Sequence, residues 1–128
     1  MIMGYLMNLM TMIFLHIIAD FNLQGILAKL KSKKFWERNY PDKKYERDYI
    51  IAMFIHSFSW TFIIMIPIFF MNNFTMTYLT FSLFLINMIV HATIDDAKAN
   101  ELKISLAQDQ LFHLLQIIIT LTVCYIFN

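Results

Sequence analysis

The sequence predicts an all-α integral membrane protein, a four-transmembrane-helix bundle with a cytoplasmic amphipathic loop between helices 1 and 2. Hydrophobic residues make up 59% of the 128 residues and charged residues only 15%, which lies outside the usual range for a soluble domain of this length. The chain contains only two Gly and two Pro residues, so few linkers are expected. A single integral membrane domain covering residues 1–128 is therefore expected.

Four apolar segments are each long enough to cross a hydrocarbon core of about 30 Å at about 1.5 Å per residue. The expected spans cover residues 1–20, 50–71, 74–95 and 106–127. The first is apolar except for Asn8, Thr11, His16 and its final residue, Asp20. No Lys or Arg precedes Lys29, so a cleaved signal peptide is not expected.

The basic residues gather in the two connections that fall on the same side of these spans. Eight of the ten Lys and Arg residues lie between Phe21 and Tyr49, and the other two are Lys98 and Lys103. The positive-inside rule therefore places both basic connections in the cytoplasm and both termini outside the cell membrane. The dipeptide at 72–73 predicts a tight turn between the second and third spans on the outer side.

The first connection combines apolar and basic side chains. Its apolar residues follow helical spacing between lysines, namely Leu23, Ile26, Leu27 and Leu30. This pattern predicts that the first helix continues along the headgroups. The aromatic residues expected to anchor it there are Trp36, Tyr40, Tyr45 and Tyr49. We expect the Lys29–Arg47 segment to contact anionic lipid headgroups. No nucleic-acid partner is expected, and the sequence does not specify an oligomeric state.

Each of the four spans carries one histidine, and all four fall in the cytoplasmic half of the membrane. His16 and His91 come near the ends of helices that run toward the cytoplasm. His56 and His113 come shortly after the starts of helices that run away from it. Three carboxylates lie four residues from a histidine and so share a helix face with it. These pairs are His16 with Asp20, His91 with Asp95, and Asp109 with His113.

Ionisable side chains inside a membrane cost about 2.5 to 3.5 kcal/mol each at its centre, so they normally face the bundle interior and pair there. Histidine nitrogens and carboxylate oxygens together suit Zn, Mn or Fe. The chain has one cysteine, Cys124, in an apolar run, so a thiolate site is not expected. The predicted metal ligands are His16, Asp20, His91, Asp95, Asp109 and His113. His56 is the candidate general base, and the residues expected to support the ligands are Gln24, Ser59, Asn87 and Gln110.

Two alternatives to metal binding stay open for these residues. The polar side chains can form a purely structural hydrogen-bond network. Asp109 can be present only to stabilise the start of its own helix, because Ser105-x-x-Gln108 resembles a capping box and the macrodipole favours an acid in the first turn. Asp95 and Asp96 come near the end of the third helix, where the dipole disfavours acids, so a cationic partner or metal is expected there.

The combined spacing resembles a known family. Its elements are His16-x-x-x-Asp20-Phe21-x-Leu23-Gln24, the isolated His56, His91-x-x-x-Asp95, and Asp109-Gln110-x-x-His113. They resemble an uncharacterised family of small bacterial and phage membrane proteins, the domain of unknown function 3307, over nearly the whole chain. The resemblance implies a four-helix membrane domain with a polar cluster at these positions, and it carries no established activity. The pattern is also loosely similar to membrane-bound metal-dependent hydrolases.

Two functions are compatible with these residues. In the first, the chain is a membrane-embedded hydrolase in which a divalent ion activates water and His56 acts as the base. In the second, it is a non-enzymatic membrane module. The polar residues then fix helix packing or handle protons or ions, and the basic connection recruits a partner or lipid. A transporter is disfavoured because the outer halves of the spans carry few polar groups.

Overall fold

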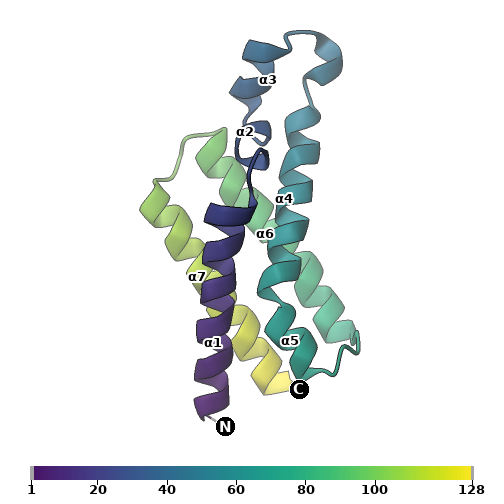
Figure 1. The fold of residues 1–128 in the computed structure, drawn as a ribbon, viewed down its shortest axis with the longest axis vertical. Coiled ribbons are helices and arrows are strands. Elements are labelled where there is room, and N and C mark those ends of the chain that lie inside the picture. Colours follow the sequence, from purple (N-terminus) through teal and green to yellow (C-terminus); the bar gives the residue numbers. More distant parts are fainter. Residues whose placement is uncertain (1, 128) are drawn as a thin grey trace.

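The computed structural model describes residues 2–127, and within this range every regular element is helical (Figure 1). The elements are α1 (Ile2–Ile17), a π-helical turn (Ile18–Leu23), α2 (Leu27–Leu30), α3 (Lys33–Asn39), a 3-10 turn (Lys43–Tyr45), α4 (Asp48–Ile64), α5 (Ile66–Met71), α6 (Tyr78–Ala99) and α7 (Leu106–Phe127). The predicted all-α class is thus confirmed for these residues. Residue 1, the expected start of the first span, and residue 128 lie outside the described residues.

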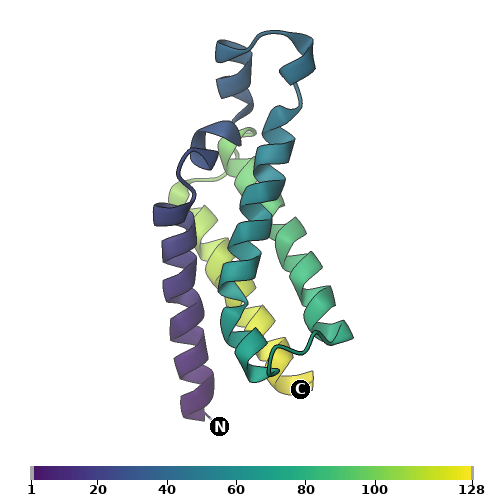
Figure 2. The same cartoon turned by 45° about the vertical axis from the view of Figure 1, so that its right-hand side comes forward.

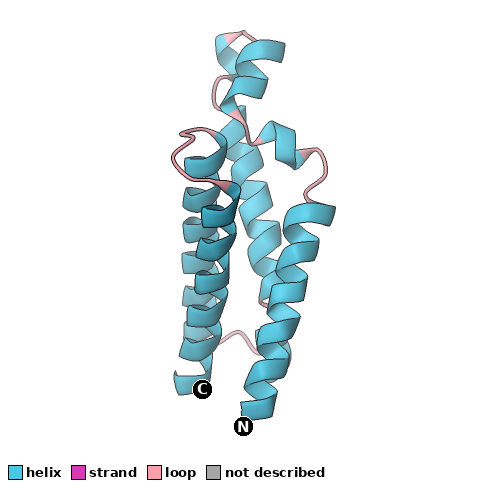
Figure 3. Cartoon of the chain, turned by 90° about the vertical axis from the view of Figure 1, so that its left-hand side faces the viewer, coloured by secondary structure: helices cyan, strands magenta, loops and turns pink. Residues whose placement is uncertain are grey.

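The long helices α1, α4, α6 and α7 pack side by side, and α5 follows α4 at the end of the bundle (Figures 1 and 2). Both ends of the described chain lie at one end of the bundle, together with the 72–77 turn. The basic segment 24–47 lies at the other end, together with the end of α6, which carries Lys98, and the 100–105 connection, which carries Lys103. There α3 and the turn after it project beyond the long helices (Figure 3). The basic residues are therefore concentrated at one end of the bundle.

The surface of the bundle is more apolar than that of a soluble helical bundle, and its interior is more polar. The long helices expose large apolar side chains, among them Phe14, Phe54, Phe62, Ile89 and Ile119. The interior combines an apolar core, which includes Met12, Ile64, Ile68, Ile117 and Leu121, with buried histidine, aspartate, asparagine and threonine side chains. So much exposed apolar surface marks contact with an apolar environment. Three helices, Ile2–Leu23, Tyr78–Ala99 and Leu106–Phe127, are long and apolar enough to cross a membrane, which indicates a membrane protein.

The second expected span, residues 50–71, is not one continuous helix. The chain breaks at Met65, so that α4 ends at Ile64 and α5 begins at Ile66. Pro67 explains the break, because proline has no amide hydrogen and its ring clashes with the carbonyl four residues earlier. α4 alone contains 17 residues. The prediction of four long spanning helices is therefore confirmed for three of them.

The third expected span, residues 74–95, is shifted toward the C-terminus in the structure. α6 begins at Tyr78, after a turn in which Asn73 and Phe74 adopt left-handed φ values of 49° and 57°. Thr77 caps the helix, since its hydroxyl accepts a hydrogen bond from the amide of Thr80 at 3.1 Å. The turn at 72–73 that the sequence predicts is thus present but extends to residue 77.

The fourth expected span, residues 106–127, coincides with α7. The capping box at its start is formed. The amide of Ser105 donates to Gln108 Oε1 at 2.9 Å, and the amide of Gln108 donates to the Ser105 hydroxyl at 3.3 Å. These bonds satisfy two amides at the helix start without help from Asp109.

The first connection folds into short pieces instead of extending α1 along a surface. The chain leaves the π turn through Gly25, whose φ of 48° suits a residue without a Cβ atom. Trp36 then packs against the rings of Tyr40 and Tyr45, with centroids 5.5 and 6.4 Å away. The Trp36 indole also donates to the carbonyl of Leu30 at 2.6 Å. Contact with anionic lipid stays a prediction.

Candidate metal centre

All four histidines and three of the aspartates meet inside the bundle, near the end that carries the basic connections. α1 supplies His16 and the π turn supplies Asp20; the others come from α4, α6 and α7. We call the group the His/Asp cluster: His16, Asp20, His56, His91, Asp95, Asp109 and His113. Each of these side chains is buried. Every member of the cluster was therefore predicted from the sequence.

The π turn positions Asp20 within the cluster. A π turn is wider than an α turn, and such turns recur at functional sites. Here it begins two residues after His16, whose Nδ1 lies 3.8 Å from Asp20 Oδ2. The side-chain amide of Gln24 donates to the backbone carbonyl of Asp20 and closes the turn. The second carboxylate oxygen of Asp20 then faces His56 Nε2 at 3.5 Å.

Two histidine nitrogens, from His56 and His91, lie close to each other and to one oxygen of each of two carboxylates, Asp20 and Asp95, at distances that suit a metal ion. The Nε2 atoms of His56 and His91 are 3.1 Å apart. Asp95 Oδ2 lies 3.2 Å from the His56 nitrogen and 3.7 Å from the His91 nitrogen. Asp20 Oδ1 lies 3.5 and 3.9 Å from the same two nitrogens. Four ligands in a tetrahedron around an ion at about 2.0 to 2.2 Å would be about 3.3 to 3.6 Å apart. The cluster thus offers a two-histidine, two-carboxylate site.

Asp20 Oδ1 adds a second indication at the same place. This oxygen is buried and accepts no hydrogen bond from the described residues. Buried carboxylate oxygens are rarely left in this way, because an unpaired buried acceptor costs about 1 to 3 kcal/mol. A cation held by the four neighbouring atoms would supply its partner.

His113 orients His91. The Nδ1 atoms of the two rings are 3.2 Å apart. His113 Nε2 lies 3.3 Å from Asp95 Oδ1 and 3.4 Å from Asp109 Oδ1. A carboxylate only accepts, so we assign the hydrogen of neutral His113 to Nε2 and the hydrogen of His91 to Nδ1. The lone pair of His91 is then on Nε2, which faces the other three donor atoms.

Two further groupings within the cluster also bring three donor atoms close together. They combine His91, Asp95 and His113, or Asp20, Asp109 and His113. Both would require a free lone pair on a ring nitrogen of His113, but its Nδ1 is paired with His91 Nδ1 and its Nε2 faces Asp95 and Asp109. The hydrogen-bond assignment places a hydrogen on Nε2, so His113 is better suited to orient a ligand than to be one.

His16 lies at the edge of the cluster, and both of its ring nitrogens are occupied. Trp60 can only donate, and its Nε1 lies 2.9 Å from His16 Nδ1. His16 Nε2 therefore carries the hydrogen and donates to Gln110 Oε1 at 3.0 Å. The Gln110 amide in turn donates to Asp109 Oδ2 at 3.0 Å and to Asp20 Oδ2 at 3.4 Å. In this arrangement His16 acts through Gln110 on the two carboxylates.

Trp60 belongs to the site although it was not predicted from the sequence. Its indole ring stacks on the imidazole of His91, with centroids 4.0 Å apart and planes 15° apart. A signal was present, since tryptophan in membrane proteins is enriched at the two interfaces and Trp60 comes near the middle of its expected span. A buried tryptophan at that depth indicates a specific partner for its N–H group.

Two lysines that were also not predicted reach the cluster, Lys31 from the first connection and Lys98 from the last turn of α6. Lys31 Nζ lies 2.5 Å from Asp95 Oδ2, and Lys98 Nζ lies 2.6 Å from Asp109 Oδ2. The expectation that Asp95 needs a cationic partner at its helix end is met by Lys31. The partner itself was not named, because Lys31 is far from Asp95 in the sequence.

The four predicted supporting residues lie in different places. Gln110 and Gln24 contact the cluster. Asn87 lies about one turn earlier on α6 than His91 and bonds to Thr120 on α7 at 2.9 Å. Ser59 is exposed and donates to the carbonyl of Ile55 in its own helix at 2.8 Å. The structure therefore does not bring Ser59 into the cluster.

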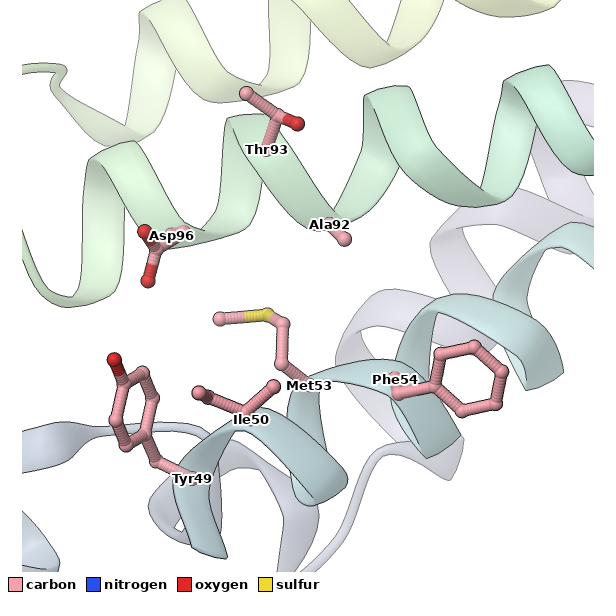
Figure 4. A pocket seen from close by; sticks show the side chains of 7 residues that line it. All are labelled: Tyr49, Ile50, Met53, Phe54, Ala92, Thr93 and Asp96. Carbon is pink, nitrogen blue, oxygen red and sulfur yellow. The ribbon is translucent and has the colours of Figure 1, made fainter. Parts of the chain in front are cut away.

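A groove of about 380 Å³ lies between α4 and α6 (Figure 4). The Tyr49 hydroxyl and the Asp96 carboxylate lie at one end, and Phe54 and Ala92 lie at the other. Among the described residues that line it, Asp96 is the only acid and none is a histidine. Neighbouring carboxylates of α6 thus serve different places, with Asp95 in the cluster and Asp96 in the groove.

The fold and the cluster together define a class: a helical membrane protein with a buried His/Asp group that can hold a metal ion. Comparisons with family models, curated proteins and solved structures find no match to this chain. The cluster itself is therefore the basis for assigning a function.

Proposed function

We propose that this chain is a multi-pass membrane protein that binds one divalent metal ion at the cytoplasmic end of its bundle and uses it for hydrolysis. The observation that carries the proposal is the set of four donor atoms from Asp20, His56, His91 and Asp95, with distances of 3.1 to 3.9 Å between the nitrogens and their neighbours. Two different helices and the π turn contribute these atoms, so folding of the bundle assembles the site.

The membrane arrangement in this proposal has four spanning segments, the second being α4 and α5 together. Their combined range, Asp48–Met71, has the length that a span requires even with the break at Met65. The concentration of Lys and Arg at one end supports a cytoplasmic location for both basic connections and an external location for both termini.

The donor set favours an ion of higher coordination number. A catalytic zinc ion usually has three protein ligands and one open position, so four protein ligands would close a tetrahedral site. Mn²⁺ and Fe²⁺ accept six ligands and retain positions for water and substrate beside the same four donors. A bound ion of this kind supplies a water-derived nucleophile at neutral pH. His56 is then a ligand, which differs from the role of base that the sequence suggested.

A non-enzymatic module is the second candidate function, and the ion pairs favour it. Lys31 and Lys98 neutralise two of the three carboxylates, and the assigned tautomers give each histidine a donor or acceptor partner. With the hydrogen of His56 on Nε2, where it can be donated to His91 Nε2, such a network can fix helix packing without metal. Membership of the family with the domain of unknown function 3307 is likewise a proposal, supported by the spacing of the cluster residues.

Metal content of the purified protein tests the proposal. The wild-type protein in mild detergent is analysed by inductively coupled plasma mass spectrometry after incubation with Mn²⁺, Fe²⁺ or Zn²⁺ and removal of free ion. We expect about one ion per chain for the wild type and for Asp96→Asn, which changes the neighbouring carboxylate outside the cluster. A folded His91→Ala/Asp95→Ala variant should retain none. Absence of stoichiometric metal from the wild type would leave the structural network as the function.

Hydrolysis is tested separately from binding. Metal-loaded protein is assayed with lipid and phosphoester substrates, and Asp96→Asn again provides the control. Turnover that disappears in His91→Ala/Asp95→Ala and persists in Asp96→Asn supports a hydrolase. Stoichiometric metal without turnover on either class of substrate would indicate a binding or structural role for the ion.

A further inference from the structure

Lys31 forms an ion pair with one of the four donor atoms of the proposed metal site. Its ammonium lies 2.5 Å from Asp95 Oδ2, the same oxygen that lies 3.2 Å from His56 Nε2. The Lys31 side chain is only 12% exposed, so the ion pair is largely shielded from water. A divalent ion bound to this oxygen would repel the ammonium, and the side chain would have to turn away.

The backbone around Lys31 is fixed to the end of α6 independently of this ion pair. The side-chain amide of Asn100 donates to the Lys31 carbonyl at 3.1 Å and to Asp96 Oδ1 at 2.6 Å. The side-chain carbonyl oxygen of Asn100 accepts a hydrogen bond from the backbone amide of Lys33 at 2.7 Å. Release of Asp95 would therefore leave the Lys31 backbone in place, with its long side chain still within reach of the ion.

The charges of the loaded site favour an anion. The described part of the site contains three carboxylates and the ammonium groups of Lys31 and Lys98. With a divalent ion and neutral histidines, positive charge exceeds negative charge by one. Lysine is a common phosphate ligand, acting as a point charge, and a phosphate oxygen can bind a metal ion and an ammonium together.

We infer that Lys31 is the anion-binding residue of this site and that the ligand it binds carries a phosphate group. The inference rests on the proposed metal site. In the metal-free protein Lys31 pairs with Asp95 and competes with the ion for Asp95 Oδ2. In the loaded protein it pairs with the phosphate oxygens of a ligand bound to that ion. Lys31 thereby couples phosphate binding to metal occupancy.

Paramagnetic relaxation of phosphorus tests the inference. Protein in detergent is loaded with Mn²⁺, inorganic phosphate is titrated in, and the ³¹P relaxation rate is measured, because bound Mn²⁺ accelerates it only at close range. The variants are Lys31→Met, the charge-conserving Lys31→Arg and the matched control Lys33→Met. Lys33 is exposed and its Nζ lies 3.9 Å from Glu37, away from the cluster. Mn²⁺ content is measured on every sample.

We expect all four proteins to bind Mn²⁺, and Lys31→Met to bind it more tightly than the wild type because the competing ammonium is gone. Phosphate affinity should fall about tenfold or more in Lys31→Met, stay unchanged in Lys33→Met and be largely retained in Lys31→Arg. Equal phosphate affinity in the wild type and Lys31→Met, with Mn²⁺ bound to both, would overturn the role of Lys31 alone. Failure of every protein to bind Mn²⁺ would overturn the metal site and this inference with it.

A second arm identifies the source of the phosphate. The Mn²⁺-loaded protein is placed in nanodiscs of phosphatidylcholine with or without phosphatidic acid. Lys31-dependent relaxation of the phosphatidic acid headgroup would identify a lipid phosphate, and relaxation of inorganic phosphate alone would identify a soluble one. Relaxation of neither would overturn the inference.

Discussion

The bundle contains two buried polar regions that differ in the charge of their side chains and in whether their potential metal ligands converge. The first is the His/Asp cluster. The second is a layer of uncharged side chains between α6 and α7, which we call the amide layer: Asn87, Gln116 and Thr120. In the amide layer Asn87 Oδ1 accepts from Gln116 Nε2 at 2.9 Å and from the Thr120 hydroxyl at 3.0 Å. The Asn87 amide donates to the carbonyl of Leu83 at 2.8 Å.

The comparison shows why the His/Asp cluster, and not the amide layer, is the candidate site. Three uncharged side chains join two helices through mutual hydrogen bonds, which is the usual function of such groups in membrane bundles. The cluster instead gathers charged groups at a cost. Buried oxygens without a hydrogen bond from the described residues occur in both regions, namely Gln116 Oε1 in the amide layer and Asp20 Oδ1 and Asp109 Oδ1 in the cluster. Those of the cluster are carboxylate oxygens that lie 3.4 to 3.9 Å from histidine nitrogens. Polar residues inside a membrane indicate a site when their ligand atoms converge, and they indicate packing when they pair off.

The largest expected effect is on the metal-free protein. Asp95→Ala removes the partner of Lys31 and of His113, and breaking a buried ion pair costs about 3 to 5 kcal/mol. We expect the free energy of unfolding in detergent, measured by chemical denaturation with a chelator present, to fall by about this amount. The double variant Asp95→Ala/Lys31→Met should recover part of the loss. A loss below about 1 kcal/mol would show that the buried ion pair of the cluster contributes no more to stability than the hydrogen bonds of the amide layer.

The next effect is stabilisation by metal. A ligand present at a concentration about one hundred times its Kd stabilises the native state by about 2.7 kcal/mol. We expect Mn²⁺ to raise the Tm of the wild type and of Asn87→Leu, since the amide layer does not contribute a ligand. Asp95→Asn should show no rise. An equal rise in all three proteins would indicate nonspecific binding, for example to acidic residues outside the cluster or to the detergent.

Much of the cluster was predictable because helical periodicity converts spacing in sequence into proximity in space. His91 and Asp95 had to share a face of α6, and the alternating direction of the spans brought all four histidines to one depth. The break at Met65 was predictable as well, because Pro67 occupies an expected span and interrupts helices generally.

The remaining features depend on tertiary geometry. The π turn at Ile18–Leu23 has no distinctive sequence, although it determines where Asp20 points. Lys31 reaches Asp95 only because the first connection folds back onto α6 through Asn100. The division between ligands and supporting histidines follows from which ring nitrogens face each other, as for His91 and His113. Spacing along a helix contains no information of this kind.

A third prediction concerns the division between histidines that are ligands and histidines that support them. His113→Phe removes the acceptor for the Nδ1 hydrogen of His91, and loss of such an orienting partner typically lowers metal affinity about 10- to 100-fold. We expect isothermal titration with Mn²⁺ to show weaker binding at an unchanged stoichiometry of about one ion per chain. Complete loss of binding would show that His113 is itself a ligand and that the tautomers are assigned the wrong way round.

The smallest expected effect belongs to the amide layer. Asn87→Leu removes an amide that bonds to Thr120 and accepts from Gln116, and hydrogen bonds between membrane helices contribute about 0.6 kcal/mol on average. Unfolding in detergent should therefore show a loss of about 1 kcal/mol, with metal content unchanged. The effect is small because Gln116 retains the backbone carbonyl of residue 87, at 2.8 Å, as an acceptor. Loss of metal from Asn87→Leu would mean that the amide layer supports the His/Asp cluster through α6, and the two regions would then be one functional unit.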